Sequence, residues 1–244
     1  MRTVLEFFTV LTVAILPHLM GGIFILTNKD YLKHFLPWQR MVASAVQDVS
    51  KILLLAYIAA DQTNGLAAIG LSIGLDEIPM TIIIAAFAAG YLSLLFVIHH
   101  LRSKKEQARR EELRKSIFEA GGFSTFKTLG ERCAYLVSLW LGVIAEDLVF
   151  RGYLVLGLGA RTGTLAPCII LSVLLSVAVH LYQGLSWRVM FTQAVFACLF
   201  IAAAVTAGNI LAAILPHLVY DTIWVLQGWA KDAKGSTVHS ESIG

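Results

Sequence analysis

The feature that most constrains this chain is a series of apolar runs, each close to the length that crosses a lipid bilayer as a helix. The two cleanest runs, residues 80–99 and 189–207, contain no Asp, Glu, Lys or Arg. A membrane-spanning helix needs about 20 consecutive, mostly apolar residues. The composition agrees, because 57% of the residues are hydrophobic and only 14% are charged, whereas soluble domains carry about 25% charged residues. We therefore predict an integral membrane protein and exclude both a water-soluble enzyme and a disordered chain.

We expect about seven transmembrane helices, packed as an all-α bundle. The predicted spans comprise residues 4–27, 41–60, 80–99, 133–160, 165–181, 189–207 and a last span that begins near residue 210. The second span is the least apolar, because Gln47, Asp48 and Lys51 lie within it. We expect this span to pack inside the bundle.

Positive charge is concentrated in one polar segment between the third and fourth spans. Residues 102–115 contain seven of the 19 Lys and Arg residues, and we expect a basic helix over 102–118 that faces the cytoplasm. We divide the chain into an N-terminal part, residues 1–131, which ends after this segment, a helical core, residues 132–230, and a loose polar tail, residues 231–244.

The net charge of +3 does not indicate a nucleic-acid partner. Short connections and small size favour a bacterial plasma membrane.

Six ionisable residues lie within or at the edges of apolar spans in the second half of the chain. They are Glu146, Asp147, Arg151, His180, His217 and Asp221. An ionisable side chain at the centre of a span costs about 2.5–3.5 kcal/mol on insertion scales, so it must be paired or face a cavity. Because these residues lie on three different spans, we expect them to converge in one polar cluster.

Helical spacing predicts pairs within this cluster. Asp147 and Arg151 are four residues apart, so they share a helix face and can form an ion pair. Glu146 lies about 100° round a regular helix from Asp147, and we expect it to stay clear of that arginine. His217 and Asp221 are also four residues apart.

The order of these motifs resembles the CAAX protease and bacteriocin-processing family of membrane proteins, also called CPBP or ABI proteins. The family's motifs stand here as Glu146-Asp147-x-x-x-Arg151, then His180, then His217-x-x-x-Asp221. The resemblance covers about residues 134–229, and the first three spans contribute no motif to it. Two positions depart from the family pattern. Asp147 stands where a second glutamate is usual, and Ser176 stands where an aromatic residue usually precedes the histidine.

The resemblance implies a glutamate-dependent intramembrane endopeptidase with no obligatory metal or other cofactor. Glu146 would be the general base that activates a water molecule, and His180 would share its proton. His217 would donate a hydrogen bond to the developing oxyanion, and Asp221 would orient His217 or assist it when protonated. The implied partners are the lipid bilayer and a peptide or protein substrate that is lipidated or embedded in the membrane.

The residues alone leave two other functions open. Two histidines and the neighbouring carboxylates could hold zinc in a metal-dependent membrane hydrolase, although the chain has no HExxH motif. The same charges could serve a non-enzymatic immunity or scaffold protein. We interpret Asp147 and Arg151 as a structural ion pair that supports the span carrying Glu146. His18, in the first span, is interpreted as an interfacial histidine without a functional role.

Overall fold

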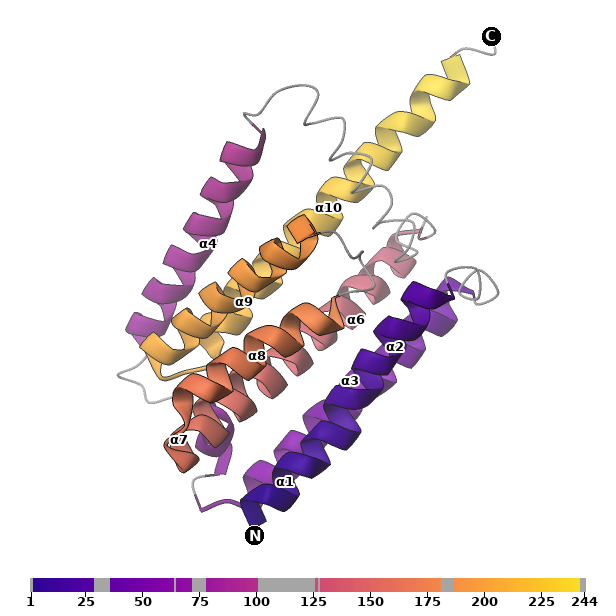
Figure 1. Cartoon of the computed structure of the whole chain (residues 1–244). Coiled ribbons are helices and arrows are strands. Elements are labelled where there is room, and N and C mark those ends of the chain that lie inside the picture. Colours follow the sequence, from indigo (N-terminus) through magenta and orange to yellow (C-terminus); the bar gives the residue numbers. More distant parts are fainter. Residues whose placement is uncertain are drawn as a thin grey trace.

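Figure 1 shows the computed structural model of the chain, which describes residues 2–28, 36–63, 65–71, 78–100, 126, 128–180 and 187–241. Within these ranges the chain is helical and forms no strand, which confirms the predicted all-α fold. The first rod is continuous and consists of α1 (Arg2–Val10), η1 (Leu11–Ile15) and α2 (Leu16–Thr27). It is followed by α3 (Pro37–Ala60), the short 3₁₀-helix η3 (Gly65–Ile69) and α4 (Ile78–His100).

The second half of the chain begins with another long, continuous rod. It consists of α6 (Leu129–Asp147), the π-helix η5 (Leu148–Gly159) and α7 (Ala160–Thr162). The remaining elements are α8 (Leu165–Val179), α9 (Trp187–Ala207) and α10 (Leu211–Glu241). The described ranges therefore contain seven helical rods, in agreement with about seven predicted spans.

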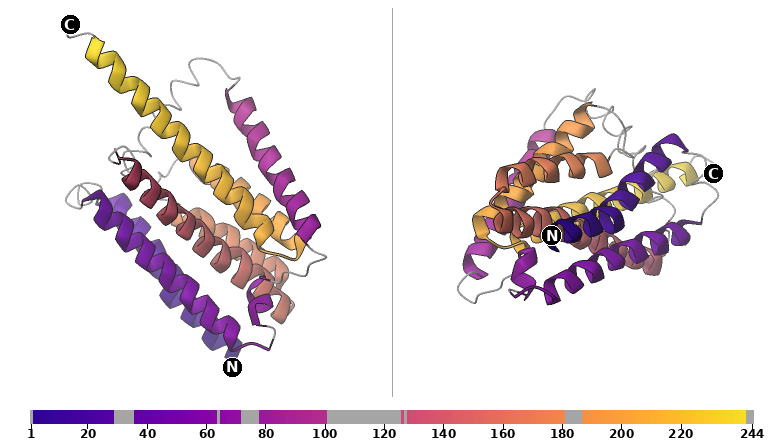
Figure 2. Two further views of the ribbon diagram at one scale, coloured as in Figure 1. Left: turned by 180° about the vertical axis from the view of Figure 1, so that it is seen from behind. Right: turned by 60° about the horizontal axis from the view of Figure 1, so that its bottom comes forward.

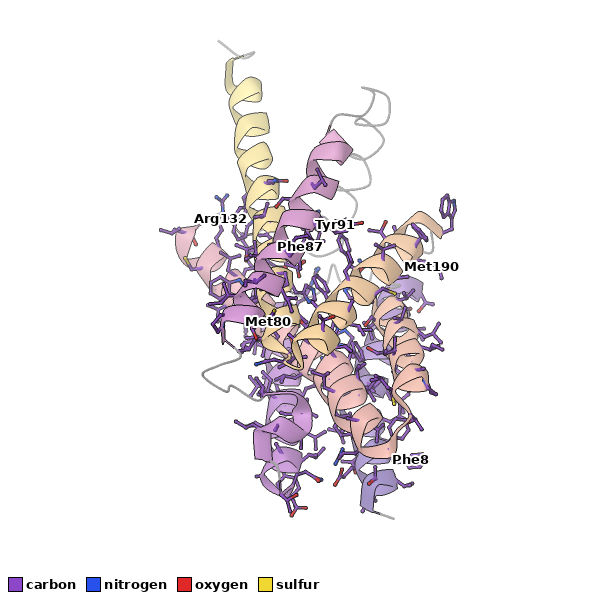
Figure 3. The ribbon with its side chains drawn as sticks, turned by 90° about the vertical axis from the view of Figure 1, so that its left-hand side faces the viewer. Phe8, Met80, Phe87, Tyr91, Arg132 and Met190 are labelled. Carbon is purple, nitrogen blue, oxygen red and sulfur yellow. The ribbon has the colours of Figure 1, made fainter. Side chains whose placement is uncertain are left out.

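Length and composition allow several of these rods to cross a membrane. The four that are long and apolar enough are Thr3–Gly21, Trp38–Ala60, Leu129–Thr162 and Val189–Ala207, with shorter apolar helices at Pro79–Leu94 and Leu165–Val179. Large apolar side chains project from their outer faces, as Phe8, Met80 and Phe87 do in Figure 3. Phe87, for example, is 81% exposed. Such exposure is unfavourable in water but suits a helix surrounded by lipid.

The rod Leu129–Thr162 lies at the centre of the bundle (Figures 1 and 2). On one side α6 packs against α3, which runs alongside the N-terminal rod. On the other side η5 packs against α8 and α9, and α6 packs against α10. Helix α4 packs on the outer side of α9 and α10. Asp147 and Arg151, in the middle of the central rod, are consequently surrounded by other helices rather than by lipid.

Close approach of backbones around η5 depends on two of its glycines. A Cβ atom added at Gly152 would lie 2.5 Å from the carbonyl oxygen of Ile69, and one added at Gly157 would overlap the carbonyl oxygen of Ala68. Both carbonyls belong to η3, so the glycines let this short helix pack directly on the central rod. Small residues at such contacts are the usual means of close helix packing in membranes.

We expect Gly152→Ala to destabilise the protein by about 1–3 kcal/mol, because the added methyl group must displace backbone rather than a flexible side chain. The matched control is Gly90→Ala in α4, where a Cβ atom meets nothing within 4 Å. The control should be neutral or slightly stabilising, since alanine is favoured over glycine within helices by roughly 0.5–1 kcal/mol. Thermal unfolding in detergent measures both effects. Equal melting temperatures for the two variants would contradict the packing argument.

The C-terminal segment differs from the expectation. Helix α10 continues to Glu241, through most of the segment that we expected to be a loose tail. Elongating an existing helix is much easier than nucleating a new one, and no proline follows Pro216 in α10 to interrupt it. The predicted basic helix over 102–118 lies outside the described residues. The division of the chain at residue 131 and its orientation in the membrane stay predictions.

Candidate functional site

The six ionisable residues singled out in the sequence lie together, between three helical rods. Glu146 and Asp147 end α6, and Arg151 follows one turn later in η5. His180 is the C-cap residue of α8, whereas His217 and Asp221 lie on α10. A hydrogen bond from Trp140 Nε1 to Thr222 Oγ1, 2.9 Å long, ties α6 to α10 beside the cluster.

Arg151 binds both neighbouring acids. Its Nη1 atom is 2.7 Å from Glu146 Oε1 and 3.0 Å from Asp147 Oδ1. The predicted Asp147–Arg151 ion pair is therefore present, but the expectation that Glu146 stays clear of the arginine is wrong. The physical reason is the change to a π-helix at Leu148, because the i to i+5 spacing of a π-helix brings residues 146 and 151 onto one face.

The orientation of His180 is set by a backbone carbonyl. Its Nδ1 atom lies 2.7 Å from the carbonyl oxygen of Ser176, which can only accept, so Nδ1 carries a hydrogen. In the neutral ring Nε2 is then an acceptor, and this atom lies 3.8 Å from Glu146 Oε2. A water molecule can lie about 2.8 Å from both atoms across such a separation. One oxygen of Glu146 is thus held by Arg151, and the other faces an imidazole that can take a proton.

His217 lies between two carboxylates. Its Nδ1 atom is 3.1 Å from Asp147 Oδ2, and its Nε2 atom is 3.7 Å from Asp221 Oδ2. The imidazole also stacks on Phe200 of α9, with 4.6 Å between ring centroids and 21° between ring planes. Asp147 consequently connects Arg151 to His217 and holds α6 and α10 in register.

Ser176 marks a departure from the family pattern. Ser176 is 2% exposed, and within the described ranges its Oγ atom has no hydrogen-bond partner. Its backbone carbonyl nevertheless binds His180. The position therefore still holds the histidine, although the aromatic ring usual in the family is absent.

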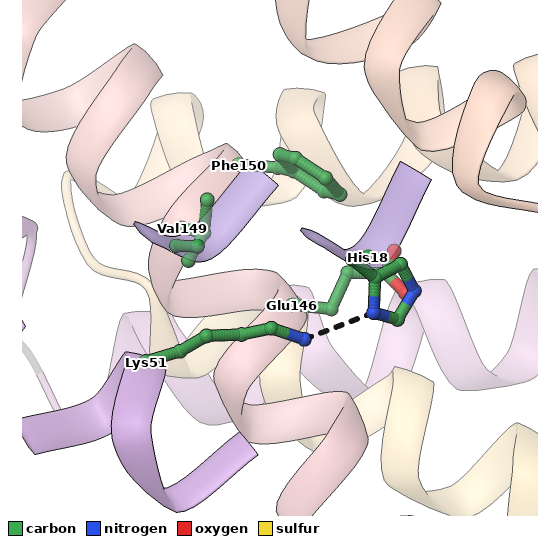
Figure 4. A pocket seen from close by; sticks show the side chains of 6 residues that line it. His18, Lys51, Glu146, Val149 and Phe150 are labelled. Carbon is green, nitrogen blue, oxygen red and sulfur yellow. Dashed lines mark hydrogen bonds between the residues drawn. The ribbon is translucent and has the colours of Figure 1, made fainter. Parts of the chain in front are cut away.

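A small pocket opens beside Glu146 (Figure 4). Its volume is about 220 Å³, including the space at its mouth, and it is lined by Ala14, His18, Lys51, Glu146, Val149 and Phe150. Glu146 itself is 15% exposed, so a water molecule can reach its carboxylate. The pocket makes the cluster accessible without exposing Asp147 or Arg151.

The N-terminal rod and α3 also contribute to this pocket, which no motif in the sequence predicts. Lys51 Nζ lies 2.7 Å from Asp48 Oδ1 and 3.0 Å from His18 Nδ1, and His18 lines the pocket. The interpretation of His18 as an interfacial residue does not fit this position. The available signal was the pair of charges at residues 48 and 51, which made the second span the least apolar.

Among the residues that the structure describes, no group of three or more His, Cys, Asp or Glu side chains is arranged to hold a metal ion. The carboxylates of Glu146 and Asp147 each contact Arg151 instead. Their charges are compensated by a guanidinium group.

Fold and cluster together define an integral membrane protein with a charged site between its helices. Residues 128–223 match the model of the Rce1-like protein family, whose description is type II CAAX prenyl endopeptidase Rce1-like. The matched segment runs from the start of α6 into α10 and includes all six residues of the cluster, so it confirms the resemblance to the CAAX protease and bacteriocin-processing family. It supports a CAAX-type membrane protease in general terms. No curated protein and no solved structure matches the chain.

Proposed function

We propose that the protein is an intramembrane endopeptidase that hydrolyses a peptide bond with a water molecule activated by Glu146, without a metal ion. The observation that carries this proposal is the pair formed by Glu146 and His180. A carboxylate oxygen and an imidazole acceptor face one another across 3.8 Å, next to a pocket that water can enter. This is the arrangement that general acid–base catalysis requires.

In the proposed reaction, water binds between Glu146 Oε2 and His180 Nε2. Glu146 removes one proton as the water oxygen attacks the carbonyl carbon of the substrate, and the carbonyl oxygen becomes an oxyanion. The oxyanion then re-forms the carbonyl double bond as the carbon–nitrogen bond of the substrate breaks. The proton passes, with the help of His180, to the nitrogen of the departing amine. The hydrogen bond from His180 Nδ1 to Ser176 keeps Nε2 directed at the reacting atoms.

The other members of the cluster take supporting roles. His217 donates a hydrogen bond to the oxyanion, which is often the largest single contribution to catalysis. Asp147 and Asp221 flank its ring and orient it. Arg151 compensates the charges of Glu146 and Asp147 and holds one oxygen of Glu146 in place.

The proposed substrate is a membrane-bound peptide with a C-terminal CAAX motif, and the proposed location is the plasma membrane of a bacterium. The description of the matched family supports the motif, and the apolar surface of the bundle supports access from lipid. Purified protein in liposomes should release the terminal residues of a prenylated CAAX peptide, detected as new termini by mass spectrometry. Absence of cleavage for both prenylated and unmodified peptides would favour a non-enzymatic role in immunity or scaffolding.

Chelators test whether the proposed reaction proceeds without a metal ion. Treatment with 1,10-phenanthroline or EDTA should leave the cleavage rate within about twofold of the untreated rate, since proton transfer by Glu146 and His180 needs no Lewis acid. The control is a zinc-dependent peptidase assayed in the same liposomes. Loss of activity on chelation, restored by added zinc, would instead support the metal-dependent hydrolase.

A further inference from the structure

A second buried ionic cluster lies beside the motif residues, on elements outside the matched segment. Asp48 and Lys51 of α3 are 3% and 4% exposed and form an ion pair 2.7 Å long. Ser44 Oγ donates a hydrogen bond of 3.3 Å to the other oxygen of Asp48. Burying an ion pair within a membrane-spanning helix is expensive, and ionisable residues retained there commonly line a functional pathway or site.

Lys51 determines which nitrogen of His18 carries the hydrogen. An ammonium group has only donors, so the His18 Nδ1 atom, 3.0 Å from Lys51 Nζ, must accept. The hydrogen of the neutral ring is then on Nε2, on the side of the imidazole away from Lys51. The ion pair with Asp48 holds Lys51 in place. The Nε2 atom of His18 can therefore donate a hydrogen bond.

His18 presents this donor to the pocket of Glu146. Both side chains line the same pocket, and Figure 4 shows the imidazole bonded to Lys51 with Glu146 next to it. His18 is also close enough to interact electrostatically with Glu146 and His180. The remaining walls of the pocket are apolar, namely Ala14, Val149 and Phe150. A substrate carbonyl group placed there would find a polar partner on the side of the N-terminal rod.

We propose that His18 is a further catalytic residue, which donates a hydrogen bond from Nε2 to the carbonyl oxygen of the peptide bond under attack. Lys51 and Asp48 act as positioning residues that fix its tautomer. As the water oxygen bonds to the carbonyl carbon and Glu146 takes its proton, the π electron pair moves to the carbonyl oxygen. His18 keeps its own proton and stabilises that oxygen from the side opposite α10. This inference rests on the proposed peptidase function.

The experiment measures kcat and KM for the CAAX peptide in liposomes. For His18→Leu, which suits an apolar span, kcat should fall about 10²-fold or more, as for other lost oxyanion donors, with KM changed less than about threefold. His18→Gln should retain kcat within about tenfold, because its amide N–H can replace Nε2–H. Asp48→Asn/Lys51→Gln should lower kcat about tenfold, since the tautomer of His18 is no longer fixed.

The matched control is Gln62→Leu. It removes a hydrogen bond of 2.7 Å to Glu6, which lies on the same N-terminal rod as His18, and it should leave kcat unchanged.

Two outcomes overturn the role of His18. One is an unchanged kcat for His18→Leu, and the other is a His18→Gln variant as slow as His18→Leu, which indicates a packing role. If His18→Leu does not fold, the double variant replaces it, and an unchanged kcat there overturns the inference. The proposed function fails separately, if wild type is no faster than Glu146→Gln. Wild-type activity above Glu146→Gln, with His18→Leu equal to wild type, refutes only the role of His18.

Discussion

Glu146→Gln should abolish most of the cleavage activity while the protein stays folded. The amide keeps a carbonyl oxygen that can accept the hydrogen bond from Arg151 Nη1, now 2.7 Å from Glu146 Oε1. It cannot remove a proton from water, because the amide nitrogen has no basic lone pair. General base catalysis contributes about 10²- to 10⁴-fold, and we expect kcat to fall within this range. Initial rates on the CAAX peptide, with the melting temperature measured on the same sample, check the prediction.

A glutamate on the same helix supplies the control. Glu131 lies in the first turn of α6, where Oε2 accepts a hydrogen bond of 2.9 Å from the Thr128 backbone N–H. Glu131→Gln keeps an acceptor at this capping box and changes the same charge, so its rate should equal that of wild type. A Glu146→Gln variant that cleaves as fast as Glu131→Gln would remove Glu146 from the mechanism.

Much of the fold and of the candidate site was predictable from the sequence, because both depend on the cost of polar groups in lipid. Apolar runs of sufficient length predict the helices directly. Charged residues on three of these runs, Glu146, His180 and His217 among them, had to converge to satisfy one another. The structure places all six such residues in one cluster. Their catalytic roles stay predictions.

The missed features depend on backbone geometry and on neighbours that no motif indicates. Placing Glu146 on a different face from Arg151 assumed a regular helix, whereas η5 is a π-helix that aligns the two. Nothing local to residue 148 indicates the wider turn. His18 lies 33 positions from Lys51 in the chain, so only the packing of the first rod against α3 reveals their contact.

Removal of the Arg151 guanidinium should have the largest effect on stability. Arg151 is 2% exposed, and its single Nη1 atom contacts both Glu146 and Asp147. Its guanidinium carbon also lies 5.8 Å from the ring centre of Phe200, within the range of a cation–π contact. Arg151→Met fills a similar volume but removes the guanidinium group that both carboxylates contact.

Breaking a buried ion pair by removing one partner costs about 3–5 kcal/mol, since the other charge stays buried and uncompensated. We expect at least this loss for Arg151→Met, and a fall in melting temperature on the order of 10 °C in detergent. The control is Arg161→Met. Arg161 pairs with Glu6 at 3.0 Å, and its own side chain is 25% exposed. Glu6 keeps the hydrogen bond of 2.7 Å that it accepts from Gln62 Nε2, so the loss should be about 1 kcal/mol or less.

A triple variant distinguishes the charge compensation that Arg151 provides from its packing contacts. Glu146→Gln/Asp147→Asn/Arg151→Met removes both acids together with the arginine, and neutral replacement of a buried ionic group is often close to neutral in stability. This triple variant should therefore melt well above Arg151→Met, although it cannot cleave substrate. If the single and triple variants melt together, the arginine stabilises the bundle through its contacts with Phe150 and Phe200. In that case the two acids tolerate burial without it, and the proposed charge compensation in the central rod is wrong.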